Sequence, residues 1–394
     1  MSAEIVASVD RDVPIVDLSP FRRDPWSKPV EDLIQLLSQG KRVFLTGAGC
    51  SQCAGLPLLG QLTEKVEGNL KPEQATSRAI LEGLKANFTG GIGCNIEDYM
   101  SELVDLIAIA DRRHTRSVAP VHLKIGEQEY TREGLVEALS VLKMGIADTI
   151  RSVRTDVATH RDFTRVVHRT LLSGKSDQGP PVDYFTLNYD TVLEDALSLE
   201  QIRYADGFYG GSTGWWNVGC YQTSGVLARV FKLHGSVDWC LLDGDTLPRR
   251  IRAGLQIAGH SEPVLIWPAT TKYRETQRDP HALMLDYLRR ELRPHPGHEV
   301  VLVICGYSFG DAHINIEIDR ALRESAQQLT LLVFTNADVP DGLLKQWTDD
   351  PALSPQVRVH ANRGFFHADT KLKSEEPLLW WKFETLARLL GGER

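Results

Sequence analysis

The turn Gly47-Ala48-Gly49 constrains the fold more than any other feature, because it directly follows a short predicted strand, residues 41–46, with an apolar Val-Phe-Leu centre. An apolar segment that runs into a glycine-rich turn is typical of the first strand-turn-helix unit of a doubly wound α/β sheet. Glycines let the backbone approach a pyrophosphate, and the N-terminus of a following helix offers free N–H groups and the positive end of its dipole. The segment therefore predicts a dinucleotide-binding turn. The alternative is a tight turn with only a structural role.

The spacing within this turn differs from that of dinucleotide-dependent dehydrogenases. Their common fingerprint has a third glycine three residues after the second, at the position where this chain has Gln52. A standard dehydrogenase loop is therefore disfavoured.

Further apolar segments predict a parallel sheet. Each is short, rich in Val, Leu, Ile or Phe, and bounded by Pro, Gly or Asn, as expected of strands buried on both faces. They are residues 184–187, 230–233, 264–267, 300–304 and 329–334. The predicted fold is α/β, a Rossmann-like parallel sheet with helices on both faces.

Between about residues 62 and 178 the strand patterns give way to apolar residues at helical spacing. We predict a helical insertion there, with Thr131 as the N-cap of one of its helices. The insertion would belong to one Rossmann-like domain spanning residues 30–394. Residues 1–29 contain three prolines before Trp26 and are predicted to form an extended N-terminal arm.

The composition argues against several classes of protein. A net charge of −8 without a long Lys/Arg run makes direct nucleic-acid binding unexpected. The chain lacks the roughly 18 consecutive apolar residues of a membrane span, and its N-terminus lacks the pattern of a signal peptide. The six cysteines are scattered rather than arranged as a disulfide framework. We therefore expect a cytoplasmic protein with reduced thiols.

Two further strand ends carry polar side chains suited to chemistry. Residues 184–187 lead into Asn188 and Asp190, and residues 230–233 lead into His234, which a glycine follows. Open α/β sheets bind ligands at the carboxyl ends of their strands, and histidine is well matched to proton transfer near neutral pH. The alternative is structural: Asn188 and Asp190 would cap a turn and a helix, and His234 would be a buried core histidine.

These segments, taken in order, resemble the motifs of the sirtuin family. Residues 47–57 read Gly-Ala-Gly-x-Ser-x-x-x-Gly-Leu-Pro, similar to a sirtuin cofactor loop that usually closes with Gly-Ile-Pro. Residues 186–190 resemble Thr-Gln-Asn-Ile-Asp, with Leu187 in place of the glutamine, and residues 233–235 resemble the catalytic Leu-His-Gly motif. Residues 58–60 are Leu-Leu-Gly where sirtuins have Asp-Phe-Arg, so no contact is inferred there.

The resemblance implies a role for each matching residue. Asn188 would orient the attacking water or the nicotinamide ribose, Asp190 would help hold the nicotinamide end, and His234 would act as the base. Residues 306–308, Gly-Tyr-Ser, are similar to the Gly-Thr-Ser motif that contacts ribose and phosphate. Asn336 follows a strand where the family often has an asparagine against the adenosine ribose; the alternative there is a turn role. The implied cofactor-binding residues are Gly47, Ala48, Gly49, Ser51, Gly55, Leu56, Pro57, Thr186, Asp190, Gly306, Tyr307, Ser308 and Asn336.

Asp311 has a separate, local interpretation. It follows the turn after residues 300–304 and precedes a segment with helical periodicity, residues 312–322. We predict that Asp311 is the N-cap of that helix.

The cysteines distinguish this chain from the protein-deacylating sirtuins, which carry four zinc-binding cysteines after the His-Gly motif. Between His234 and Cys305 only Cys240 is present, so a tetrahedral thiolate zinc site cannot be assembled there. No zinc and no metal ligands are therefore predicted. The chain is most similar in this respect to zinc-free prokaryotic sirtuin-like proteins, several of which hydrolyse NAD in anti-phage defence. Residues 95–98 and 267–272 agree with that branch.

The expected function is therefore an NAD hydrolase, with NAD as substrate and nicotinamide and ADP-ribose as products. Some members of the branch pair with a HerA-type ATPase, which makes such an ATPase an implied partner. A homo-oligomer is also expected, with the N-terminal arm or the helical insertion as interface. Two alternatives remain, an NAD-dependent protein deacylase that uses the same two residues and a non-catalytic module that senses NAD or ADP-ribose.

Overall fold

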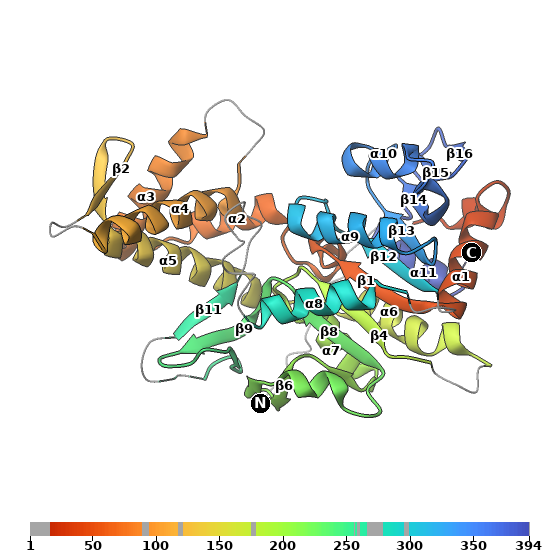
Figure 1. The fold of residues 1–394 in the computed structure, drawn as a ribbon, viewed down its shortest axis with the longest axis horizontal. Coiled ribbons are helices and arrows are strands. Elements are labelled where there is room, and N and C mark those ends of the chain that lie inside the picture. The colour runs from red at the N-terminus through yellow and green to blue at the C-terminus, as the bar shows by residue number, and fades with distance from the viewer. Residues whose placement is uncertain are drawn as a thin grey trace, which may run out of the picture.

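The computed structural model describes residues 16–88, 94–116, 121–174, 179–255, 257, 261–265, 279–294 and 299–393. Residues 1–15 of the expected arm and residues 267–272 lie outside this part of the chain. Figure 1 shows a sheet flanked by helices, from which a group of helices extends to one side.

Within the described residues, the main sheet has nine strands in the order β16-β15-β14-β13-β12-β1-β4-β8-β5. Neighbouring strands from β14 to β5 are parallel, and β15 and β16 add an antiparallel edge. The strands are β1 (Lys41–Thr46), β4 (Val182–Thr186), β5 (Tyr204–Ala205), β8 (Ala228–Lys232), β12 (Val300–Cys305), β13 (Leu329–Phe334), β14 (Val357–Ala361), β15 (Gly364–His367) and β16 (Thr370–Lys373). The predicted α/β class with a mostly parallel sheet is confirmed.

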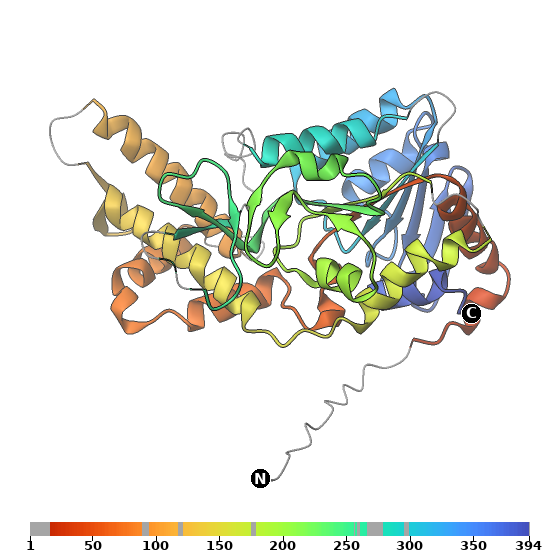
Figure 2. The same cartoon turned by 90° about the horizontal axis from the view of Figure 1, so that it is seen from below.

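Helices cover both faces of this sheet (Figure 2). Alternate residues of one strand face opposite layers: Val301 and Val303 of β12 pack in one hydrophobic core, and Leu302 and Ile304 pack in the other. The first core contains side chains of α1 (Ser27–Gln39), α6 (Ala158–His168), α7 (Val192–Leu199) and α11 (Phe383–Leu390). The second contains side chains of α8 (His281–Glu291), α9 (Ala312–Glu324) and α10 (Gly342–Asp349).

The helical insertion forms the extension seen in Figure 1, and its hydrophobic core also takes in Tyr189, Val237 and Leu265 from outside the insertion. It comprises α2 (Leu59–Gly68), α3 (Ala75–Asn87), α4 (Ile96–His114), α5 (Arg132–Arg151) and a small hairpin of β2 (His122–Ile125) and β3 (Gln128–Thr131). Thr131 caps α5, as predicted, by accepting a hydrogen bond from the amide of Gly134 at 3.2 Å. Helix α6 falls inside the range expected for the insertion, yet it buries Phe163 and Val167 against the main sheet. Its apolar face therefore joins it to the α/β body.

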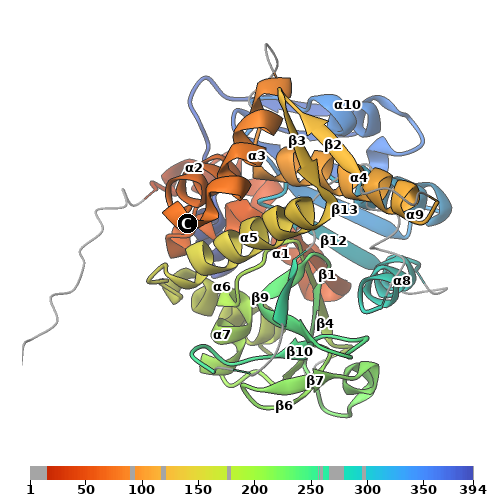
Figure 3. The ribbon, with the colours of Figure 1, turned by 90° about the vertical axis from the view of Figure 1, so that its left-hand side faces the viewer.

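A second, antiparallel sheet has the order β11-β9-β10-β7-β6 among the described residues, and Figure 3 shows it below the insertion. Its strands are β6 (Phe208–Gly210), β7 (Gly214–Trp216), β9 (Gly235–Leu242), β10 (Arg249–Arg250) and β11 (Ser261–Leu265). The expectation that residues 264–267 form a parallel strand of the main sheet is wrong for its described part, because β11 pairs antiparallel with β9. Gly235, with φ of +79°, redirects the chain out of the main sheet, and a Cβ there would lie 2.1 Å from the carbonyl oxygen of Val264.

The described part of the N-terminal arm, residues 16–29, contains a 3-10 turn (Ser19–Arg22) and the first residues of α1. Phe21 is fully buried and stacks on Trp380 with ring centroids 5.4 Å apart. This part of the arm therefore packs on the C-terminal region of the same chain. No helix in the described part of the chain combines the length and apolar character needed to cross a membrane.

Candidate active site

The order of the strands defines where a ligand is expected. From β1 the chain continues to β4 and β8 on one side, then crosses to β12, β13 and β14 on the other side of β1. The side on which successive strands are added thus changes between β1 and β12. Open α/β sheets bind ligands at the carboxyl ends of the strands at such a point. Except for Asn336, which is exposed after β13, every expected site residue lies at the ends of β1, β4, β8 or β12 or in the segments that follow them.

The glycine turn after β1 packs against the turn after β12. The amide of Gly47 donates to the carbonyl of Cys305, and that of Gly49 donates to the carbonyl of Gly306, each at 3.0 Å. A Cβ on Gly47 would lie 2.4 Å from the Gly306 oxygen, and a Cβ on Gly306 would lie 2.4 Å from the Cys50 nitrogen. These glycines therefore bring two loops into backbone contact, which is a structural reason for them beside any contact with a ligand.

The turn does not lead directly into an α-helix. Two 3-10 turns, Ala48–Cys50 and Gln52–Ala54, follow it, and Gly55 ends the second with φ of +90°. Leu56 is buried, and α2 begins only at Leu59. The expected helix N-terminus at the glycine turn is therefore wrong, and the helix-dipole argument does not apply to this loop.

Asn188 and Ser51 meet at this edge of the sheet. The Asn188 amide nitrogen Nδ2 donates to Ser51 Oγ at 2.8 Å, and the Asn188 backbone N–H donates to Thr186 Oγ1 at 3.1 Å. The other side-chain atom of Asn188, Oδ1, is buried and accepts no hydrogen bond from the described residues. The hydrogen bond from Nδ2 thus orients the Asn188 side chain. Its Oδ1 atom is suited to accept a hydrogen bond from a water or a sugar hydroxyl.

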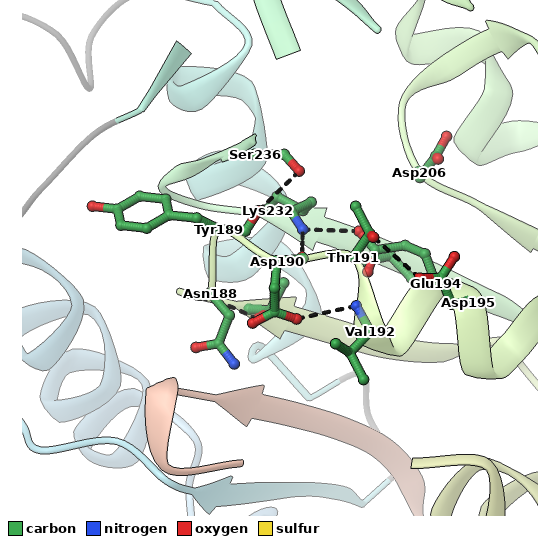
Figure 4. A network of polar contacts seen from close by, with 12 residues as sticks. Asn188, Tyr189, Asp190, Thr191, Val192, Glu194, Asp195, Asp206, Lys232 and Ser236 are labelled. Atoms are coloured by element: carbon green, nitrogen blue, oxygen red, sulfur yellow. Dashed lines mark hydrogen bonds and ion pairs between the residues drawn. The ribbon is translucent and has the colours of Figure 1, made fainter. Parts of the chain in front are cut away.

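The turn from Asn188 to Val192 is held by Asp190 and by two residues that the sequence did not single out, Lys232 and Glu194 (Figure 4). Asp190 Oδ1 accepts a hydrogen bond from the backbone amide of Val192 at 3.1 Å, so the capping role considered for Asp190 is present. The Lys232 ammonium donates to the backbone carbonyl of Asp190 and lies 3.0 Å from Glu194 Oε1. A lysine inside the apolar strand 230–233 was the available sequence signal, because a buried lysine requires polar partners.

The Lys232–Glu194 pair is almost fully buried, with 1% and 8% of the two residues exposed. Burial raises the pKa of Glu194 to about 7, and the attraction of Lys232 limits that rise. Burial alone would lower the pKa of Lys232, but the carboxylates of Glu194, Asp190 and Asp238 outweigh it and raise the pKa. A charged ammonium is therefore kept beneath the turn that carries Asn188.

His234 faces the carboxylate of Asp311, with 3.6 Å between His234 Nε2 and Asp311 Oδ1, and both residues are buried. Asp311 does occupy the N-cap position of α9, but its side chain makes no capping hydrogen bond. The predicted N-cap position is therefore confirmed, without the hydrogen bond that a capping side chain usually makes. A carboxylate beside an imidazole instead orients the ring and stabilises its protonated form.

The loop that carries Asp311 is tightly fixed. The Asp311 amide donates to the hydroxyl of Tyr307 at 3.0 Å, and this hydroxyl donates to Asn315 Oδ1, also at 3.0 Å. Asn315 Nδ2 donates in turn to the carbonyl of Phe309 at 2.7 Å, and Phe309 has a left-handed φ of +60°. Tyr307 is buried and supports this loop, whereas Ser308 is exposed. Strained backbone of this kind is concentrated at functional sites.

The two expected catalytic residues lie on neighbouring strand ends. Thr186 of β4 is the register partner of Lys232 of β8, and Asn188 and His234 each follow two residues later. Adjacent strands are about 4.8 Å apart, and the rings of Tyr189 and His234 are in contact at 6.4 Å between centroids. The structure thus gathers Ser51, Asn188 and His234 at one edge of the sheet.

One group in the described part of the chain could hold a metal ion. His234, Asp311 and His313 each offer a ligand atom, and these atoms all lie within 4.8 Å of one another. All six cysteines are free thiols.

A cavity of about 1130 Å³ lies between α5, α7 and the second sheet, on the far side of the turn after β4. Asp190, Glu194 and Lys232 belong to its wall, whereas Asn188 and His234 do not. A second cavity of only about 10 Å³ is lined by Ser51 and Asn188, and again by Asp190 and Glu194. Asp190 and Glu194 therefore separate Asn188 from a space large enough for a nucleotide-sized ligand.

In comparisons with known proteins, a family model described as a SIR2-like domain matches residues 182–351. The matched segment contains Asn188, His234 and the turn 306–308, and it begins after the glycine turn of β1. No curated protein matches the chain significantly. The match supports a sirtuin-like family, and SIR2-like domains use NAD, so it suggests NAD-related activity in general.

Proposed function

We propose that this chain hydrolyses NAD at the nicotinamide–ribose bond. The observation that carries the proposal is the side-chain amide of Asn188, whose nitrogen is bonded to Ser51 and whose buried oxygen accepts no hydrogen bond from the described residues. It lies beside the strand end that carries His234, and both residues fall within the SIR2-like match. An oriented acceptor next to a histidine is what water activation requires.

The reaction breaks the bond between C1′ of the ribose and the pyridinium nitrogen. The electron pair of that bond goes to the nitrogen, so nicotinamide leaves as a neutral molecule and needs no strong acid. The Asn188 oxygen orients a water on the opposite face of the ribose, and the water oxygen forms the new bond to C1′. His234 accepts the water proton, directly or through the ribose hydroxyls, and the Asp311 carboxylate 3.6 Å away stabilises the imidazolium.

The residues fit NAD in one respect, because the Asn188 oxygen is a buried acceptor suited to a water or a ribose hydroxyl. The cavity of about 1130 Å³ has the size of a dinucleotide site, but Asp190 and Glu194 lie between it and Asn188, so it does not add to this fit. The glycine turn supports the fit less directly, because two of its N–H groups bond to the turn after β12.

We also propose a cellular role, which rests on the sequence resemblance alone. The chain would deplete NAD in the cytoplasm as an effector of anti-phage defence, acting as a homo-oligomer together with a HerA-type ATPase. Size-exclusion chromatography with light scattering, alone and with such an ATPase, tests the assembly.

The decisive experiment is chromatography of NAD after incubation with the purified protein. We expect nicotinamide and ADP-ribose in equal amounts from the wild type, and loss of both products in the Asn188→Ala and His234→Ala variants. His122→Ala, which alters an exposed histidine in the insertion, is the matched control and should retain full activity.

The other outcomes distinguish the alternatives. Turnover that requires an added acetyl-lysine peptide would replace hydrolysis by deacylation. Intact NAD that nevertheless binds, as measured by calorimetry, would favour a sensing module. Products that persist in both the Asn188 and the His234 variant would contradict the assigned mechanism.

A further inference from the structure

We propose that His234, Asp311 and His313 form a binding site for a divalent transition metal such as Zn²⁺, and that the bound metal switches off His234. The inhibitory effect rests on the proposed NAD hydrolysis. Metal binding itself does not, and it can be measured without any substrate.

The distances between the ligand atoms are close to those of a metal site. A tetrahedral zinc ion with ligand distances of about 2.0–2.1 Å holds its ligand atoms about 3.4 Å apart. In the structure Asp311 Oδ1 lies 3.6 Å from His234 Nε2 and 4.0 Å from His313 Nδ1, and the three atoms all fall within 4.8 Å. Small rotations of the side chains would close the site around an ion.

The site is largely prepared by the fold. Asp311 and His313 come from the junction of β12 and α9, and Asn315 bonds to this junction through its backbone and its side chain. The Tyr307 hydroxyl fixes the backbone of Asp311, and His234 follows the end of β8, which β1 and β4 separate from β12 in the sheet. Contacts of this kind around metal ligands set their orientation and raise metal affinity.

The donor atoms select the type of metal. Two imidazoles and one carboxylate suit Zn²⁺, Co²⁺ and Ni²⁺, whereas Mg²⁺ and Ca²⁺ prefer oxygen ligands only. Three protein ligands also leave one position of a tetrahedral ion for water. His313 is 25% exposed at its side chain while the other two ligands are buried, so an ion would enter from the side of His313.

A metal at this position changes the chemistry of His234. A neutral imidazole carries one proton, and the nitrogen that faces Asp311 is Nε2. When a metal takes the lone pair of Nε2, the ring proton must reside on Nδ1, and the ring can then no longer accept a proton from water. Occupancy of the site therefore competes with base catalysis without displacing any residue.

The first test uses Co²⁺, whose visible absorption reports tetrahedral coordination by nitrogen and oxygen. The wild type should develop this absorption at one equivalent, and His313→Ala should lose it. His122→Ala should behave as the wild type. A spectrum that is unchanged in His313→Ala would place the cobalt elsewhere, and the absence of any spectrum in the wild type would also overturn the proposal.

The second test measures NAD hydrolysis at increasing Zn²⁺. His313 is outside the proposed catalytic residues, so His313→Ala should keep the metal-free rate. The zinc concentration for half inhibition should rise by at least roughly tenfold in that variant. Equal inhibition of both proteins would mean that zinc acts at another group. If the wild type lacks hydrolase activity, the cobalt experiment still decides whether the metal site exists.

Discussion

Replacing Lys232 by methionine tests how the turn that carries Asn188 is held. The substitution keeps most of the volume of the side chain but removes the ammonium from the carbonyl of Asp190 and from Glu194. Loss of one partner of a buried ion pair costs about 3–5 kcal/mol when the other partner keeps its charge. Without the ammonium the pKa of Glu194 rises further, so the carboxyl can take up a proton instead of remaining a lone buried charge. At pH 8 we therefore expect the free energy of unfolding to fall by the lower end of that range, about 3 kcal/mol.

The effect should depend on pH, and the pKa of Glu194 determines the direction. Its folded-state pKa is about 7, above the ordinary value of 4.5, so the folded protein holds this proton more tightly than the unfolded chain. In the wild type this group therefore lowers stability as the pH rises from 4.5 to 7, by about 3 kcal/mol in total. At pH 5 Glu194 is mostly protonated with or without the lysine. Only hydrogen bonds are then lost in the variant, at about 1–2 kcal/mol.

The assay is thermal unfolding of the wild type and the variant at both pH values. At about 2.1 cal/mol/K per residue, the 394 residues give an unfolding entropy of about 0.8 kcal/mol/K. The Tm should fall by about 4 °C at pH 8 and by about 1–2 °C at pH 5. Lys85→Met is the matched control, because Lys85 pairs with Glu67 at 2.7 Å but is 40% exposed. Its Tm should change by about 1 °C or less.

Two results would refute this reasoning. An equal fall in the Tm of the Lys232→Met variant at pH 5 and pH 8 would show that the charge of Glu194 does not contribute to the loss of stability. A loss at pH 8 no larger than that of the surface control would show that the buried pair does not stabilise the fold.

Three further predictions concern the site itself. Gly306→Ala should abolish soluble expression or lower the Tm by several degrees, because the new Cβ would lie 2.4 Å from the backbone nitrogen of Cys50. The control is Gly244→Ala, which is also at positive φ but has open space around it. It should lower the free energy of unfolding by only about 1 kcal/mol. Ser51→Ala should lower the kcat of NAD hydrolysis by about threefold to tenfold, because Asn188 loses a hydrogen bond of about 0.5–1.5 kcal/mol, and an unchanged kcat would speak against that role. Asp311→Asn should reduce kcat while KM stays within about twofold, since the carboxylate acts on His234 rather than on substrate, and steady-state kinetics would expose an effect on KM alone.

The parallel strands could be predicted because their signal is local. Residues 300–304 are continuously apolar, residues 329–334 contain a single threonine, and residues 41–46 have an apolar Val-Phe-Leu centre. Such segments are stable only where helices cover both faces of a sheet. The cap at Thr131 was equally predictable, since its hydrogen bond reaches only three residues along the chain. The insertion boundary was not, because α6 shows the same periodicity whether it packs on the insertion or on the main sheet.

Two features of the candidate site depended on contacts that no local pattern contains. Lys232 and Glu194 meet across 38 positions of sequence, and His234 and Asp311 meet across 77. The N-cap position of Asp311 was recognisable, but the direction of its side chain depends on where β8 ends. The pairing of residues 261–265 with β9 also depends on a distant part of the chain, because it follows from the turn at Gly235.

The sequence by itself determined the class of fold, the strands of its centre, and the positions of Asn188 and His234 at strand ends, because hydrophobic period and turn residues act over a few positions. Only the tertiary structure decided what surrounds those two residues. Sheet order and register bring Ser51 to Asn188, Asp311 to His234 and Lys232 beneath the turn at Asp190. The alignment of whole strands sets these contacts. Burial then makes the interaction energies of these groups larger than they would be in water.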